Sequence, residues 1–125
     1  MRTLPFVIAI IFMISSCKKT DPQKDEIKYE IISTVSAPMA IEYVNQFGTW
    51  NSEDFVGNSW SKTIDASQYD TFQFTCTQNL QGVLGTQNII VRIYYRGEMV
   101  AEQINDVTNT IDIYSDLYGY VYFTI

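Results

Sequence analysis

The sequence contains no histidine, only two cysteines and no cluster of basic residues. Without histidine, the usual general base near neutral pH, the Ser-His and Cys-His nucleophile pairs and the commonest zinc ligand are all missing. Two cysteines, Cys17 and Cys76, cannot build the disulfide framework of a small secreted domain. These absences argue against the commonest hydrolases and metalloproteins. We therefore expect a protein that is not an enzyme and holds no metal.

Basic residues are scarce along the whole chain. Its 125 residues carry 8 Lys and Arg against 14 Asp and Glu, which gives a formal net charge of −6. Nucleic-acid binding requires clustered Lys and Arg to neutralise phosphates, and electrostatic docking on anionic lipid headgroups requires the same. We expect no nucleic-acid partner. Any attachment to a membrane must then depend on something other than surface charge.

One apolar run is present, and it lies at the N-terminus. Residues 4–14 are almost wholly apolar and follow Arg2, and Ser15 and Ser16 come next. The run is shorter than the ~20 residues that span a bilayer, and its layout is that of a secretory signal. We predict a helical signal peptide over residues 1–16, cut between Ser16 and Cys17.

The residues at the cut, Ile14-Ser15-Ser16-Cys17, resemble the bacterial lipobox. The resemblance implies that the sulfur of Cys17 carries diacylglycerol and fatty acyl chains, the only covalent group we expect. Each buried CH₂ contributes about 0.8 kcal/mol, so two or three chains anchor a protein stably. The alternative is an ordinary secretory signal followed by a chance cysteine. In bacterial lipoproteins, a residue such as Lys18 after the cysteine favours the outer membrane over retention in the inner one.

Residues 17–26 are predicted to be the lipidated cysteine and a flexible tether, because Pro22 is the only apolar residue after Cys17. Residues 23–26 resemble the Lys-acidic surface-export tag of Bacteroidota-type lipoproteins but lie further from Cys17 than that tag usually does. A plain solvated tether is the alternative. The leaflet that carries the anchor, periplasmic or surface-exposed, stays open.

From Ile27 onward the apolar residues alternate with polar ones, most clearly where Phe72, Phe74 and Cys76 share one face. No window predicts an amphipathic helix. The strand candidates are residues 27–31, 39–43, 49–56, 60–64, 69–77, 88–95, 99–104, 110–114 and 120–125. Short strands separated by turn signals predict one all-β domain over residues 27–125. We expect an immunoglobulin-like antiparallel β-sandwich of about seven or eight strands.

Several stretches resemble the MmpS (small mycobacterial membrane protein) domain and the related β-sandwich lipoproteins of Gram-negative bacteria. They are residues 28–31, 41–45, Gly48, Trp60-Ser61-Lys62-Thr63, and 91–94 with Gly97. The resemblance covers residues 27–125, although Ser59 replaces the proline that usually precedes the tryptophan. It implies an immunoglobulin-like sandwich and an accessory role beside a lipid or siderophore exporter, with an envelope protein or export complex as partner.

Aromatic residues supply the candidate interaction sites. Trp60 with Lys62 could mark a contact surface, or Trp60 could fill the core while Lys62 extends past it. An aromatic face for sugar rings, in a surface glycan-binding lipoprotein, is the alternative function; cross-strand pairing within the sheet is the structural alternative. The residues of that face are Trp50, Tyr94, Tyr118, Tyr120 and Tyr122.

The remaining candidates favour structural roles. The carboxylates lie in Glu53-Asp54, in Asp65 with Asp70, and among residues 106–116, where the order of a Ca²⁺ loop is missing. A glycosidase would need two of them at a fixed separation in a cleft, so solvated turn residues are the preferred interpretation. Cys76 alternates with Phe72 and Phe74 and should be a buried apolar group.

The lipobox interpretation predicts that Cys17→Ala abolishes labelling of the protein by a fatty-acid analogue. The sulfur that accepts the lipid is then gone, so the chain should stay unprocessed or become soluble. Labelling and membrane fractionation of the two forms measure this. Continued labelling with continued membrane retention of Cys17→Ala would rule out Cys17 as the anchor.

Overall fold

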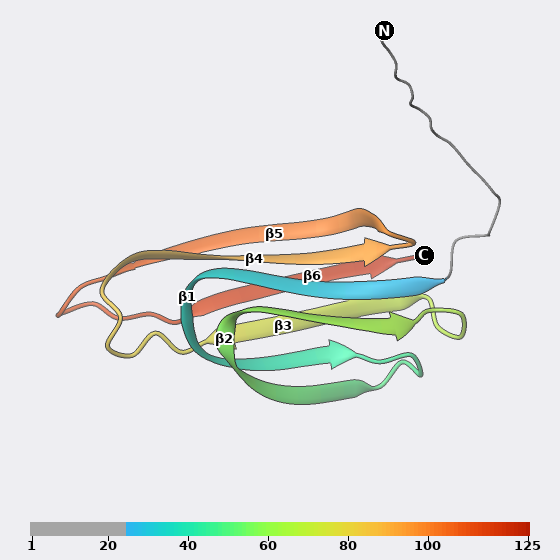
Figure 1. Cartoon of the computed structure of the whole chain (residues 1–125), viewed down its shortest axis with the longest axis horizontal. Coiled ribbons are helices and arrows are strands. Elements are labelled where there is room, and N and C mark those ends of the chain that lie inside the picture. The colour runs from blue at the N-terminus through green and yellow to red at the C-terminus, as the bar shows by residue number, and fades with distance from the viewer. Residues whose placement is uncertain (1–24) are drawn as a thin grey trace, which may run out of the picture.

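The computed structural model describes residues 25–125, which form six β-strands in one antiparallel sheet (Figure 1). The strands are β1 (Glu26–Val44), β2 (Trp50–Asp65), β3 (Thr71–Gln78), β4 (Gly85–Tyr95), β5 (Glu98–Asn109) and β6 (Leu117–Thr124). The all-β prediction is confirmed. The predicted signal peptide and Cys17 lie outside the described residues. Glu26, which the sequence places in the tether, is the first residue of β1. No helix that could cross a membrane occurs within residues 25–125.

β1 organises the sheet because it pairs with three other strands. It pairs with β2 along most of its length, with β4 through residues 27–33 and with β3 through residues 39–43. Its register with β2 shifts between Ile32 and Ala37, where Figure 1 shows β1 turning from one layer to the other. One layer therefore contains β5, β4 and the first part of β1. The other contains β6, β3 and the last part of β1, and β2 follows β1 through both.

The bends explain why six strands replace the expected seven or eight. The segments 27–31 and 39–43 are both parts of β1, and 49–56 and 60–64 are both parts of β2. The predicted strand 110–114 is wrong: these residues form a loop. There the hydroxyl of Thr110 accepts hydrogen bonds from the backbone N–H groups of Asp112 and Ile113, and this turn overrides the alternation of apolar residues.

The core lies between the two layers and follows the predicted alternation. Phe72, Phe74 and Cys76 of β3 are fully buried, as expected. The ring of Tyr29 lies 4.8 Å from that of Phe74, and the Tyr29 hydroxyl donates a hydrogen bond of 2.7 Å to the carbonyl of Val44. Burying each such side chain contributes roughly 1.5–3 kcal/mol, so both layers are held by side chains of β1 and β3.

Gln78 is a fully buried polar residue that sits against both bends. Its amide nitrogen donates hydrogen bonds to the carbonyls of Val35 (2.9 Å), Ala37 (3.4 Å) and Gly57 (3.2 Å). Its amide oxygen accepts one of 2.6 Å from the Ser33 hydroxyl. The register between β1 and β2 shifts at the bends, and the Gln78 side chain supplies hydrogen bonds to carbonyls beside this shift.

The sandwich is nearly closed on its other side, where β5 meets β6 through side chains. The amide oxygen of Gln103 accepts a hydrogen bond of 2.8 Å from the backbone N–H of Tyr120. The amide nitrogen of Asn105 donates to the carbonyl of Tyr118. Two side-chain amides thus replace the backbone ladder at this seam, and they cover facing edges of β5 and β6.

Gln78→Leu should lower the free energy of unfolding by about 2–4 kcal/mol, because it leaves buried carbonyls and the Ser33 hydroxyl without partners. Gln73→Leu is the matched control: Gln73 lies on the same strand, on the outer face, and the change should cost less than about 1 kcal/mol. Chemical denaturation measures both. Equal losses in the two variants would contradict the role given to Gln78.

Candidate functional site

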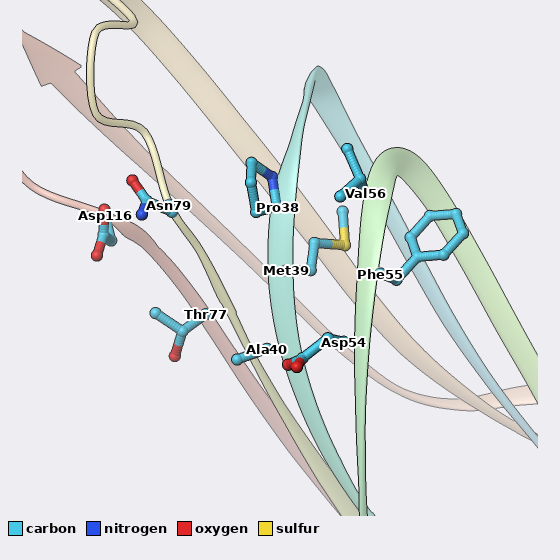
Figure 2. Close-up of a pocket in the computed structure, with 9 residues that line it drawn as sticks. All are labelled: Pro38, Met39, Ala40, Asp54, Phe55, Val56, Thr77, Asn79 and Asp116. Atoms are coloured by element: carbon cyan, nitrogen blue, oxygen red, sulfur yellow. The ribbon is translucent and has the colours of Figure 1, made fainter.

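An open groove of about 520 Å³ lies beside the two bends (Figure 2). Strands β1, β2 and β3 and the residues next to β3 and β6 form it. Its lining residues are Pro38, Met39, Ala40, Asp54, Phe55, Val56, Thr77, Asn79 and Asp116. In Figure 2, Asn79 and Asp116 lie on one side of β1, and Phe55 and Val56 lie on the other. Segments far apart in the sequence therefore meet here.

The bends shape this groove. Pro38 lies within β1, next to the register shift, where a residue without an N–H group is tolerated. Its carbonyl accepts a hydrogen bond of 2.8 Å from the backbone N–H of Asn79, which ties the end of β3 to the bend. At Gly57, an added Cβ would lie 2.5 Å from the ring of Phe55, so glycine lets that ring fold back along β2.

The groove combines apolar walls with two carboxylates. One carboxylate oxygen of Asp116 accepts a hydrogen bond of 3.0 Å from the backbone N–H of Leu80 and another from the hydroxyl of Tyr114. Asp54 forms no salt bridge within residues 25–125. Such a groove can accept an apolar group that carries a cation or hydrogen-bond donors at its edge.

The two carboxylates belong to segments on opposite edges of this layer. Asp54 lies opposite Ala40, Ala40 opposite Thr77, and Thr77 opposite Tyr118, two residues from Asp116. Three strand spacings of about 4.8 Å place these backbones about 14 Å apart. The sequence does not predict this groove, because it does not show which strands pair and so which segments lie near each other.

Trp60 lies in the core, which confirms the structural interpretation of this residue. It is 9% exposed, and its ring lies 5.8 Å from that of Tyr43 and 6.4 Å from that of Phe74. Lys62 lies two residues further along β2 and forms a salt bridge of 2.6 Å with Glu53. The Trp60-Lys62 pair thus joins the two halves of β2 across its bend.

The carboxylate of Glu53 is the centre of this cluster. Besides Lys62, it accepts hydrogen bonds from the Tyr43 hydroxyl (3.0 Å) and the indole N–H of Trp60 (3.3 Å). The hydrogen bond from Lys62, followed by those from Tyr43 and Trp60, holds the pKa of Glu53 below its ordinary value. Glu53 in return raises the pKa of Lys62. The sequence shows no sign of this cluster beyond the spacing of its members on β2.

The predicted aromatic face divides between the two layers. Tyr118, Tyr120 and Tyr122 share the outer face of β6, where Tyr118 is 50% and Tyr122 is 62% exposed. The rings of Tyr120 and Tyr122 stack, with centroids 6.2 Å apart at 29°. Trp50 projects from the same layer at its far edge, two strands beyond β3. Tyr94 lies on the other layer, where its hydroxyl donates to Glu30 (2.8 Å).

The remaining candidates from the sequence are the thiol of Cys76 and possible metal ligands. Cys76 is fully buried, and burial raises the pKa of its thiol to about 12, so it stays protonated at neutral pH. Within residues 25–125, no three Asp, Glu or Cys side chains gather closely enough to hold a metal ion.

Glu53→Gln should lower the free energy of unfolding by about 0.5–1 kcal/mol at pH 7, a small loss because the pair with Lys62 is partly exposed. The folded-state pKa of Glu53 is depressed, so its contribution is present above the unfolded pKa of about 4.3 and is lost as pH falls through the folded value. The difference from wild type should therefore shrink below about pH 4. Chemical denaturation at several pH values measures it, with Asp54→Asn as control. A difference that stays constant down to about pH 2 would contradict this assignment.

Comparison of the sequence with models of known protein families gives no match, and comparison with curated proteins gives none either. The likeness to the MmpS domain therefore stays a prediction from short stretches of sequence. Function has to be argued from the surfaces of residues 25–125 and from the sequence that precedes them.

Proposed function

We propose that this protein is a lipid-anchored envelope lipoprotein whose β domain binds a partner and performs no chemistry. The observation that carries the proposal is the sequence Ile14-Ser15-Ser16-Cys17 after a short apolar run. Diacylglycerol and fatty acyl chains on Cys17 would hold the domain at the outer membrane, the location that Lys18 favours. The leaflet is left open.

The described surfaces support binding rather than catalysis. The groove offers apolar walls, and its two carboxylates, Asp54 and Asp116, come from segments about three strand spacings apart. The chain has no histidine to activate a nucleophile, and Cys76 is buried. The partner we propose is an envelope protein, and an export complex of the kind implied by the MmpS resemblance is one such partner.

A second candidate function, glycan binding, is supported by the three tyrosines of β6. Tyr118 and Tyr122 are exposed, and Tyr120 stacks against Tyr122 on an outer face. Flat aromatic rings of this kind supply large contact area at low conformational cost. Trp50 would lie about 14 Å across the sheet, so only the tyrosines would form a continuous platform.

One comparison separates the two functions: wild type, Tyr118→Ala with Tyr122→Ala, and the control Tyr94→Ala on the other layer. The lipidated proteins are crosslinked in native membranes and purified, and the soluble domains are run through gels containing envelope polysaccharides. The binding proposal predicts that all three forms retain the same crosslinked envelope protein and that none is retarded by polysaccharide.

Glycan binding predicts the reverse. The wild type and Tyr94→Ala would be retarded, and the double variant would lose at least about tenfold in affinity, since each aromatic contact contributes roughly 1 kcal/mol or more. That outcome, with no crosslinked protein, would replace the first proposal by the second.

A further inference from the structure

Two neighbouring loops at the end of the domain opposite the start of β1 carry exposed apolar side chains. We call Leu84, Ile111, Ile113 and Tyr114 the distal tip; their exposed fractions are 58, 90, 64 and 51%. They come from the β3–β4 and β5–β6 loops, which Figure 1 places at the end farthest from the start of β1. Gly85 pairs with Asn109, so the two loops emerge side by side. Apolar side chains exposed on neighbouring loops can form the kind of patch that marks an interaction site.

The distal tip is held by hydrogen bonds between its two loops. The Tyr114 hydroxyl donates to Asp116 and lies 3.1 Å from the amide oxygen of Asn79, and Asp116 also accepts from the backbone N–H of Leu80. Asn109 exchanges two hydrogen bonds of 2.9 Å with the backbone of Ser115. Ile111 and Ile113 therefore lie on a loop whose conformation is fixed by hydrogen bonds. A surface organised in advance loses little conformational entropy on binding.

The charges around the distal tip are all of one sign. Residues 25–125 contain four cations, and each lies within 4 Å of a carboxylate: Lys28, Lys62, Arg92 and Arg96. None of them belongs to residues 79–91 or 97–125. Asp112 lies between Ile111 and Ile113, and Asp116 connects the distal tip to the groove that also holds Asp54.

We infer that the distal tip is a docking surface for a protein that offers an apolar socket rimmed by lysine and arginine. The inference deepens the proposed function and rests on it. Carboxylates beside the apolar residues would repel anionic headgroups, and two distal tips would repel each other, whereas a basic rim is complementary. The distal tip lies opposite the start of β1, so the predicted anchor segment joins the domain at its other end.

The experiment places a photo-crosslinking amino acid at Ile111 of the full-length, lipidated protein in cells. The same probe at Met99 is the matched control, because Met99 is 51% exposed at the β4–β5 hairpin near the start of β1. We expect a crosslink from position 111 to one envelope protein. Mass spectrometry should map it to a peptide with apolar residues flanked by Lys or Arg. Position 99 should give no such adduct.

Ile113→Ser and Asp112→Lys should each reduce that crosslink by about fivefold or more, since truncation at a hot spot costs more than 1 kcal/mol. Val100→Ser, an exposed change at the other end, should leave the yield unchanged. Equal thermal midpoints would show that the variants fold. A crosslink only to lipid, only to a second copy of the chain, equal from positions 111 and 99, or insensitive to both changes would overturn the inference. No adduct at all would do the same. Membrane retention of Cys17→Ala would instead refute the proposed anchor, whatever the distal tip binds.

Discussion

The structure depends on how two long strands change layers without leaving buried backbone groups unsatisfied. β1 and β2 run as a pair through a bend at which their register shifts, and a bend of this kind breaks the regular ladder. The side-chain amide of Gln78 reaches carbonyls on both strands and also binds Ser33. One fully buried side chain thus links both bends of a nearly closed, six-stranded sandwich.

The position of the bends decides where the surfaces lie. β1 begins at one end of the domain, runs to the other end, bends there and runs back (Figure 1). The groove and the distal tip lie near the bend, away from the first residue of β1. The cations of residues 25–125 are held in salt bridges, and the groove and distal tip present carboxylates beside apolar side chains. These surfaces support the proposal that the domain is a binding module.

Much of the fold could be predicted because the alternation of apolar and polar residues along a strand indicates which side chains are buried. Phe72, Phe74 and Cys76 were expected on one face and are buried together, and Trp60 fills the core. Alternation does not report where a strand bends, so two strands were predicted as four segments. Gln78 continues the inward face of β3, and its polar character there, like Pro38 and Gly57 within the long strands, is a sequence sign of the bends.

The surfaces could be predicted less well, because they depend on register between distant segments. The groove joins Pro38, Asp54 and Asp116, and no local pattern connects them. Tyr94 was grouped with the tyrosines of β6, yet it projects from the other layer because β4 and β6 belong to different layers. The apolar residues of 110–114 suggested a strand, whereas the turn formed by Thr110 exposes them.

The account as a whole depends on the chemical state of one sulfur, and intact-mass spectrometry of the protein purified from membranes tests it most directly. The predicted chain begins at Cys17 and carries a diacylglycerol thioether and further acyl chains, with residues 1–16 absent. A chain that retains residues 1–16, or that begins at Cys17 with a free thiol, would contradict the account.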